Sequence, residues 1–357
     1  MEKLKIAFQE YLSEYFDKTI TVLNIREIPG GFLSKAYVLS CLDSMQSFEL
    51  FSRTISSNRG GYAYPIDRFR AFNISDQMYK NANGDIMSHG IMTYKDGKYT
   101  SQLDFSNNTQ FFHIQDYKVG SSYQSEYFSL VNQDTLTEEN KEILRKIASK
   151  IAILHTKEVP EQSDDIYAKE LYIRGYRELL INPELTLDVF SQFDPSHSFF
   201  GQVPHKHNYL EKMHQEYDRM ILSTRERKLS FLHGDFWSSN ILIDTENNPF
   251  FIDYSRIPYG DAGIDIGWFV GNFVLEYIKT KNRIYLDAAK VFMDEYIKET
   301  GDKDILQYLV LPLFWLGIIN IFPPVFGDHH PEIAKEILRY IEKCFKEGEL
   351  LIEELHF

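Results

Sequence analysis

The chain has 357 residues, of which 43% are hydrophobic and 15% are aromatic. This composition suits one large or two ordinary packed domains and excludes a disordered chain. The 38 Lys and Arg residues against 52 Asp and Glu residues give a formal net charge of -14. An acidic chain without a basic cluster repels a phosphate backbone, so we expect no nucleic acid as a partner.

The sequence also lacks the signals of secretion and of membrane insertion. Cys41 and Cys344 are its only cysteines, too few for a disulfide framework. The start, "MEKLKIAFQEYLSEYF", mixes charged and aromatic residues instead of forming a continuous apolar segment. The longest apolar run, residues 309–322, is shorter than the roughly 20 residues of a membrane span and contains Pro312. We therefore expect a cytoplasmic protein with no membrane partner.

The first 118 residues predict a small sheet with one helix. Short runs rich in β-branched and aromatic residues predict strands over 19–28, 36–41, 47–52 and 109–117. Between them, apolar residues recur at roughly helical spacing over 66–80.

After Gly120 the pattern becomes mainly helical. One helix is predicted to begin at Thr135 or Thr137 as its cap and to end near residue 156. Further helices are predicted over 165–180, 209–223, 264–279, 284–299, 306–322 and 331–355. The boundary between the two patterns is "QDYKVGSS", residues 115–122. Two lobes joined there would form a cleft, a common place for ligands.

Residues 240–253, "NILIDTENNPFFID", predict a hairpin that interrupts the helical part. We expect a tight turn at Glu246 and Asn247, because Asn tolerates the left-handed conformation. A two-residue turn would oppose these pairs: Ile243 with Phe250, Leu242 with Phe251, Ile241 with Ile252, and Asn240 with Asp253. Asp235, in the loop just before the hairpin, would then lie next to the last pair.

Two carboxylates brought together in this way need a counter-charge. At 4 Å they repel by about 4 kcal/mol for an effective dielectric near 20. Mg²⁺ offsets such repulsion, because it takes one or two carboxylates and keeps water and substrate phosphates as further ligands. Singly, Asn240 could serve a turn, Asp253 a strand end and Asp235 a loop hydrogen bond. Their combination in one motif favours a metal that holds phosphate.

The stretch "HGDFWSSNILI" with "FIDYSRIPYGDAGIDIGWF", within residues 231–269, resembles the aminoglycoside phosphotransferase and choline kinase family of small-molecule kinases. Three other segments match in the right order: "IPGGFLSKAYVL" as the nucleotide loop, "FFHIQDYKVG" as the hinge, and "AILHT" as the helix end before the catalytic half. The resemblance implies an α+β, two-lobed protein-kinase-like fold. A nucleotide-binding lobe of small antiparallel sheet and one helix would span residues 1–118. A mainly helical catalytic and substrate-binding lobe would span 119–357, with the hinge near 115–120.

The resemblance also implies roles for the matching residues. Asp235 would orient the acceptor hydroxyl and take its proton, while Asn240 and Asp253 would bind the Mg²⁺ that bridges the phosphates of ATP. His233 and Asp265 would brace the loop that carries Asp235. The nucleotide would contact Gly30, Gly31, Arg53, Gln115, Tyr117, Leu242 and Ile252. Leu242 and Ile252 could equally be core residues, and the Gly pair could simply form a hairpin turn.

One position departs from the family pattern. The family carries a basic residue, usually Lys, on the third strand to grip the phosphates, and Arg53 is the nearest substitute in "SFELFSRTIS". Arg and Lys differ in reach and in hydrogen-bond geometry, and Arg53 could instead be a solvated surface residue. The acidic partner expected on the helix could be Asp67 or Asp76.

The sequence therefore predicts an ATP-dependent phosphotransferase that acts on a hydroxyl of a small molecule such as a sugar, an aminoalcohol or an aminoglycoside. A homodimer is left open. The alternatives are a catalytically weak nucleotide-binding regulator, suggested by the missing strand Lys, and a kinase acting on a protein.

Overall fold

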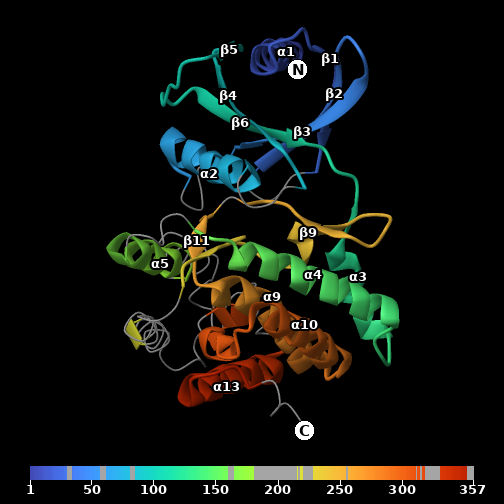
Figure 1. Ribbon diagram of the computed structural model, residues 1–357, viewed down its shortest axis with the longest axis vertical. Coiled ribbons are helices and arrows are strands. Elements are labelled where there is room, and N and C mark those ends of the chain that lie inside the picture. Colours follow the sequence, from blue (N-terminus) through green and yellow to red (C-terminus); the bar gives the residue numbers. More distant parts are fainter. Residues whose placement is uncertain are drawn as a thin grey trace. The chain divides into compact units, whose positions relative to one another are not determined.

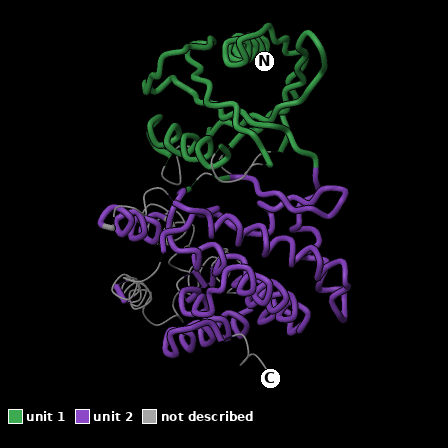
Figure 2. The backbone as a smooth tube through the Cα atoms, in the orientation of Figure 1, with its two compact units in different colours: residues 1–119, 254–256 green, residues 120–253, 257–357 purple. Residues whose placement is uncertain are grey.

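The computed structural model describes residues 1–29, 34–56, 62–80, 85–159, 165–180, 215, 218–219, 228–254, 256–310, 312–313, 316–317 and 330–351. The chain forms two compact units (Figure 2). The first comprises Met1–Val119 and Tyr254–Arg256, and the second comprises Gly120–Asp253 and Ile257–Phe357. The assignment of nucleotide binding to residues 1–118 and of catalysis to residues 119–357 stays a prediction.

The first unit is built on a curled, six-stranded antiparallel sheet (Figure 1). Its strand order is β1-β2-β3-β6-β4-β5. The strands are β1 (Thr21–Ile28), β2 (Ser34–Leu42), β3 (Ser47–Ile55), β4 (Ser88–Lys95), β5 (Lys98–Thr100) and β6 (Thr109–Asp116). The sequence predicted β1, β2, β3 and β6 but not β4 and β5, whose Gly and Lys residues weaken the alternating pattern.

Two helices, α1 (Glu2–Tyr15) and α2 (Pro65–Met78), pack on opposite faces of this sheet. Successive side chains of a strand alternate between its faces. Phe112 of β6 accordingly meets Phe8 of α1, with ring centroids 5.3 Å apart. Its neighbour Phe111 meets Phe69 of α2 at 5.2 Å. Only α2 was predicted; α1 buries Ala7, Phe8, Tyr11 and Leu12 on one face, a helical spacing that the sequence does contain.

The second unit is mainly helical. Among the described residues its helices are α3 (Tyr123–Ser129), α4 (Glu138–Thr156), α5 (Asp165–Leu180), α9 (Ala262–Thr280), α10 (Ile284–Thr300) and α13 (Pro331–Glu347), together with the short 3₁₀ helices η2 (Leu130–Asn132), η5 (Ser238–Asn240) and η6 (Ile305–Tyr308). The unit also contains two small sheets. One consists of β10 (Pro249–Phe251), β9 (Ile241–Ile243) and β7 (Ser121–Ser122). The other consists of β11 (Tyr259–Gly260) and β8 (Ser230–Phe231).

The helices predicted near α4, α5, α9 and α10 are present, and Thr137 caps α4 by accepting a hydrogen bond from Asn140 N. The helix predicted over 331–355 ends earlier, because Gly348 adopts a left-handed conformation (φ 79°) that terminates α13. Most of the segment 209–223 lies outside the described residues. Of the helix predicted over 306–322, the described residues 310, 312–313 and 316–317 are helical, while 306–308 belong to a short 3₁₀ helix, and the remaining prediction falls partly outside the described residues.

The register predicted for the hairpin is wrong. Pro249 lies opposite Ile243, Phe250 opposite Leu242 and Phe251 opposite Ile241, so the pairing is shifted by one residue. The loop has five residues, 244–248, instead of two. Asp244 sets this length, because its carboxylate accepts hydrogen bonds from Glu246 N and Asn248 N, both at 2.8 Å. Asn247 takes the left-handed conformation, as predicted for the turn.

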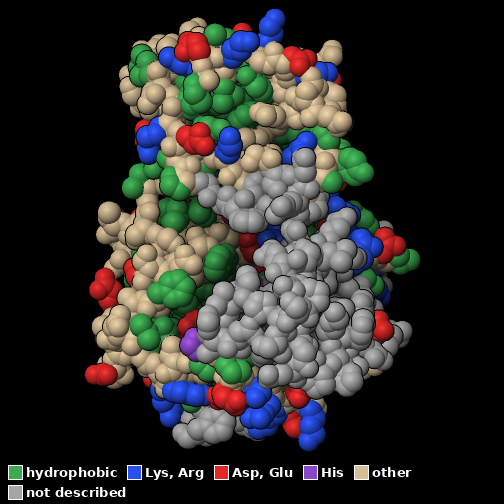
Figure 3. All heavy atoms as spheres, turned by 180° about the vertical axis from the view of Figure 1, so that it is seen from behind, with side chains coloured by type: hydrophobic (Ala, Val, Ile, Leu, Met, Phe, Trp, Pro, Cys, Tyr) green, Lys and Arg blue, Asp and Glu red, His purple; other side chains and the backbone are tan. Residues whose placement is uncertain are grey.

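None of the helices among the described residues is both long and apolar enough to cross a membrane. On the face shown in Figure 3, acidic and basic side chains are interspersed over the described surface.

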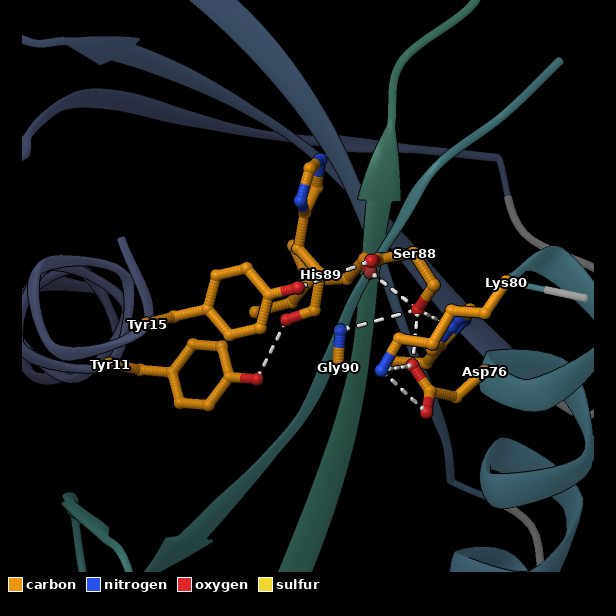
Figure 4. Close-up of polar contacts among 9 residues, drawn as sticks. Tyr11, Tyr15, Asp76, Lys80, Ser88, His89 and Gly90 are labelled. Carbon is orange, nitrogen blue, oxygen red and sulfur yellow. Dashed lines mark hydrogen bonds and ion pairs between the residues drawn. The ribbon is translucent and has the colours of Figure 1, made fainter. Parts of the chain in front are cut away.

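Strand β4 contains an irregularity that joins α1 to the sheet (Figure 4). The register with β6 shifts between Ser88 and Ile91, and Gly90 has φ 85°. Tyr11 of α1 donates a hydrogen bond from its hydroxyl to the His89 carbonyl at 2.7 Å. A Cβ atom at Gly90 would lie 2.5 Å from that hydroxyl.

We expect Gly90→Ala to lower the free energy of unfolding by about 2 to 3 kcal/mol, because it combines left-handed backbone strain with a steric clash. Gly301→Ala is the matched control. Gly301 has φ 72°, but a Cβ atom added there would meet no atom of the described residues within 4 Å, so only the backbone cost of about 1 kcal/mol applies. Urea denaturation of both variants measures the difference. Equal losses would show that Tyr11 does not restrict this position.

Candidate active site

The residues that carry the predicted chemistry begin directly after β8, in the loop 233–240. His233 and Gly234 each donate a backbone hydrogen bond to the Asp265 carboxylate, to Oδ2 at 2.6 Å and to Oδ1 at 2.9 Å respectively. Gly234 has φ 79°, a conformation that favours glycine. The start of the 233–240 loop is therefore fixed by one carboxylate.

Asp265 lies in the first turn of α9 and is fully buried. A buried carboxylate is costly unless hydrogen bonds replace its hydration. A third donor, His155 Nε2 at the end of α4, lies 3.1 Å from Oδ2, and His155 Nδ1 lies 2.9 Å from the Tyr296 hydroxyl of α10. Asp265 thus connects three helices of the second unit to the 233–240 loop.

The start of α9 is held by a second buried acid, Asp261. Its carboxylate caps the helix by accepting a hydrogen bond from Gly263 N at 2.6 Å. It also accepts a hydrogen bond from the Tyr172 hydroxyl of α5. Burial and the adjacent Asp261 charge raise the pKa of Tyr172 well above its usual value, so this phenol stays a donor.

His233 is a buried, neutral imidazole that forms hydrogen bonds with both the 233–240 loop and the hairpin. Its Nε2 lies 2.8 Å from the Ile252 carbonyl, which can only accept, so this nitrogen carries the proton. Its Nδ1 accepts a hydrogen bond from Asp235 N at 3.3 Å. Burial lowers the pKa of His233, although the carboxylates of Asp265, Asp235 and Asp253 act in the opposite direction. The neutral form satisfies both hydrogen bonds.

Asp235 and Asn240 lie together within the 233–240 loop. The Asn240 side-chain amide donates to the Asp235 carbonyl at 2.9 Å and to its carboxylate at 3.3 Å. The loop itself is closed by backbone hydrogen bonds from Trp237 N to Asp235 O at 3.1 Å and from Asn240 N to Trp237 O at 3.0 Å. Asn240 is buried and Asp235 is half-buried.

Contrary to the prediction, Asp253 does not lie opposite Asn240 in the hairpin; the residue before it, Ile252, does. Ile252 N donates to the Asn240 carbonyl at 3.0 Å, which continues the observed hairpin register. Asp253 follows in a left-handed conformation, φ 68°. A non-glycine residue there carries backbone strain of about 1 kcal/mol or more, which the surrounding contacts must outweigh.

The donor set of this group fits Mg²⁺. The Asn240 nitrogen is engaged with Asp235, so its amide oxygen is the atom that can serve as a hard ligand. That oxygen accepts a hydrogen bond from Ser239 Oγ at 3.4 Å, and Asp253 adds a carboxylate. Within the described part of the chain, no cluster of three or more His, Cys, Asp and Glu side chains could hold a metal ion. One carboxylate with one amide oxygen is a set that suits Mg²⁺ bound jointly to a phosphate substrate.

The residues predicted to bind the nucleotide are distributed over both units. Gly30 and Gly31 lie outside the described residues. Gln115 is buried at the end of β6, and Tyr117 follows it, half-buried. Leu242 and Ile252 are half-buried in the hairpin. Their contacts with a nucleotide stay predictions.

Arg53 lies on β3 and turns toward α2. Its Nη2 donates to the Ser75 hydroxyl at 3.1 Å, and its guanidinium lies 5.6 Å from the Phe72 ring centroid. The two acids considered as its partner bind elsewhere. Asp67 accepts a hydrogen bond from Tyr64 N at 2.9 Å, and Asp76 accepts one from Ser88 and pairs with Lys80.

The family model described as choline/ethanolamine kinase matches residues 125–342, more than half of the chain. The chain belongs to this family. It is therefore a member of a group of small-molecule kinases, as the motif within residues 231–269 indicated. A search among curated protein sequences gives no match.

Similarity to a solved aminoglycoside phosphotransferase structure supports the protein-kinase-like fold. A thermostable mutant of aminoglycoside phosphotransferase APH(4)-Ia is 13% identical, covers 95% of this chain with 99% of its own, and has a TM-score of 0.51. The ethanolamine kinase of Plasmodium vivax is 12% identical over 88% of this chain and 82% of its own, with a TM-score of 0.49. The predicted α+β fold class is confirmed.

Sequence reasoning missed three residues that shape the site of this choline/ethanolamine kinase family member. Asp261 stands in the quoted "YGDAGID", where an acid directly before a helical run signals an N-cap. His155 stands in "AILHT", a segment whose resemblance to the family indicates a helix end and no role for the histidine. Ser75 gave no signal, because a serine within a helix is ordinarily a solvated or core position.

The neutral state of His233 predicts a pH dependence of stability. In the unfolded chain its pKa is near 6.5, and burial lowers it in the folded protein. Between these two pKa values the unfolded chain binds more protons, so the free energy of unfolding decreases as pH falls below about 6.5.

We expect His233→Gln to lose less stability than the wild type between pH 7 and pH 5, as measured by urea denaturation at each pH. His330→Gln, which alters an exposed histidine at the start of α13, should keep the wild-type slope. A wild-type slope in His233→Gln would mean that His233 is charged in the folded protein.

Proposed function

We propose that this protein transfers the γ-phosphate of ATP to a hydroxyl group of a small molecule. The observation that carries the proposal is the group formed by Asp235, Asn240 and Asp253 around one buried imidazole, His233. Membership of the choline/ethanolamine kinase family supports the reaction class.

Asp235 would act on the acceptor. Its carboxylate is half-buried on a loop closed by backbone hydrogen bonds, and the Asn240 amide holds one of its oxygens. A carboxylate fixed in this way can orient a hydroxyl and accept its proton. The acceptor oxygen forms the new bond to the γ-phosphorus, the bond from that phosphorus to the bridging oxygen breaks, ADP leaves, and the proton passes to Asp235.

Asn240 and Asp253 would hold Mg²⁺ through the amide oxygen and the carboxylate. When bound, this ion would neutralise charge on the phosphates. His233 and Asp265 keep both ligands in register, because His233 bonds to Ile252 next to Asp253 and Asp265 fixes the backbone of His233.

In this proposal the nucleotide contacts Gly30, Gly31, Arg53, Gln115, Tyr117, Leu242 and Ile252. Arg53 donates a hydrogen bond to Ser75, and in this proposal its guanidinium also meets a phosphate.

The acceptor belongs to the class of sugars, aminoalcohols or aminoglycosides. Trp237, two residues after Asp235, is 37% exposed and offers an aromatic face to such a molecule. The cytoplasmic location and a homodimer stay predictions.

A catalytically weak nucleotide-binding regulator is the second candidate. It is favoured by Arg53 in place of the strand Lys, because its guanidinium is shared with Ser75 and Phe72. Such a protein would bind ATP without forming a product.

The two candidates are separated by product detection with the wild type and Asp235→Asn. We expect the wild type with ATP and Mg²⁺ to phosphorylate one class in a panel of sugars, aminoalcohols and aminoglycosides, detected by mass spectrometry. Asp235→Asn should reduce turnover about 10²- to 10⁴-fold, because the proton acceptor is lost. Asp287→Asn, the same change at an exposed acid of α10, is the control and should keep wild-type turnover.

Full turnover by Asp235→Asn would exclude Asp235 as the base. Binding of ATP without product across the whole panel would favour the regulator.

A further inference from the structure

Tyr254, the residue that follows Asp253, is fixed to α2 within the first unit. The Ser75 hydroxyl donates a hydrogen bond to the Tyr254 carbonyl. The Tyr254 ring meets the Tyr79 ring edge to face, with centroids 5.1 Å apart. Tyr254 and Ser75 are both buried, at 1% and 0% exposure. The chain thus leaves the hairpin and is held at its next residue by one helix.

The part of α2 that carries Ser75 is itself firmly attached to the sheet. Asp76 accepts a hydrogen bond from the Ser88 hydroxyl of β4 at 2.6 Å and pairs with Lys80 (Figure 4). The Ser88 hydroxyl also lies 2.9 Å from His113 Nε2 of β6. The His113 ring stacks against Phe72 at 6.1 Å and against Tyr79 at 5.7 Å. Ser75 therefore occupies a fixed position relative to β4 and β6.

Arg53 determines the direction in which Ser75 donates. The Ser75 oxygen accepts a hydrogen bond from Arg53 Nη2 at 3.1 Å. A serine hydroxyl has one proton, and a guanidinium has no acceptor, so that proton is available only to other partners. The Tyr254 carbonyl is such a partner and can only accept. The guanidinium charge strengthens this hydrogen bond by polarising the hydroxyl.

Asp253 consequently has a fixed neighbour on each side. Before it, Ile252 donates its N–H to Asn240 O at 3.0 Å and accepts a hydrogen bond from His233 Nε2 at 2.8 Å. After it, the Tyr254 carbonyl is bonded to Ser75. Asp253 itself has the strained φ of 68°. Strain at a single residue persists only where the surroundings determine it from both ends.

We propose that Ser75 is a positioning residue for Asp253: by holding the Tyr254 carbonyl, it keeps Asp253 in the conformation in which its carboxylate serves the metal. The inference rests on the proposed function, in which Asp253 is a Mg²⁺ ligand. Ser75 is a neutral residue that is oriented by Arg53, and it holds the residue that follows the proposed metal ligand Asp253. Loss of the Ser75 hydroxyl would release the backbone on the C-terminal side of Asp253 without removing a proposed Mg²⁺ ligand.

The test is the affinity for ATP measured by calorimetry in Mg²⁺ and again in EDTA. We expect Ser75→Ala to weaken ATP binding about tenfold in Mg²⁺, the size of one lost hydrogen bond, and less than twofold in EDTA. Ser52→Ala is the matched control. Ser52 is a fully buried serine on β3 next to Arg53, and its hydroxyl has no hydrogen-bond partner among the described residues. Its loss should change neither affinity.

Ser75→Cys provides a second variant of similar size with a weaker donor, for use if Ser75→Ala does not fold. The affinity of Ser75→Cys for ATP in Mg²⁺ should be lower than that of the wild type, but by less than tenfold. Wild-type affinity in Mg²⁺ for a folded Ser75 variant would overturn the positioning role, as would equal losses in Mg²⁺ and EDTA. A wild-type protein that binds ATP equally well in Mg²⁺ and EDTA would instead overturn the metal site on which the inference rests.

Discussion

The arrangement of the site depends on one buried carboxylate, Asp265. Two backbone N–H groups of the 233–240 loop and the His155 imidazole donate to it, so its charge is compensated by three hydrogen bonds. Such an acid cannot be removed without leaving buried donors unsatisfied. Because the hydrogen bonds come from α4 and from the loop that carries Asp235, folding of the second unit also sets the geometry of the loop. Stability and the proposed chemistry share the same interaction.

The backbone of Asp253 is constrained on both sides. It is the last residue of the second unit before the chain enters the first at Tyr254. Its neighbours are held by the 233–240 loop on one side and by α2 on the other, and its backbone is strained between them. In the proposed kinase, the metal ligand is therefore the residue whose conformation depends on contacts made in both units.

The sequence predicts the fold class and the family because both rest on local patterns. Helical periodicity indicates α4, α9 and α10, and the spacing of Asp235, Asn240 and Asp253 brings the motif to one hairpin. The hairpin register was wrong because Asp244, not Asn247 alone, sets the loop length through its side chain. Ser75 and His155 could not be predicted, because their roles arise from contacts over 179 and 110 residues of sequence. The Gly pair of the nucleotide loop lies outside the described residues.

Hydrogen exchange of the segment 231–240 in Asp265→Asn tests the central role of this carboxylate most directly. Asn offers one acceptor oxygen and places an NH₂ group where the second N–H donor points, so at least one of the His233 and Gly234 amides loses its partner. We predict that exchange in this segment becomes at least about tenfold faster than in the wild type, while segments of α1 exchange at unchanged rates. Unchanged exchange at residues 231–240 in a folded Asp265→Asn protein would show that Asp265 does not fix the 233–240 loop.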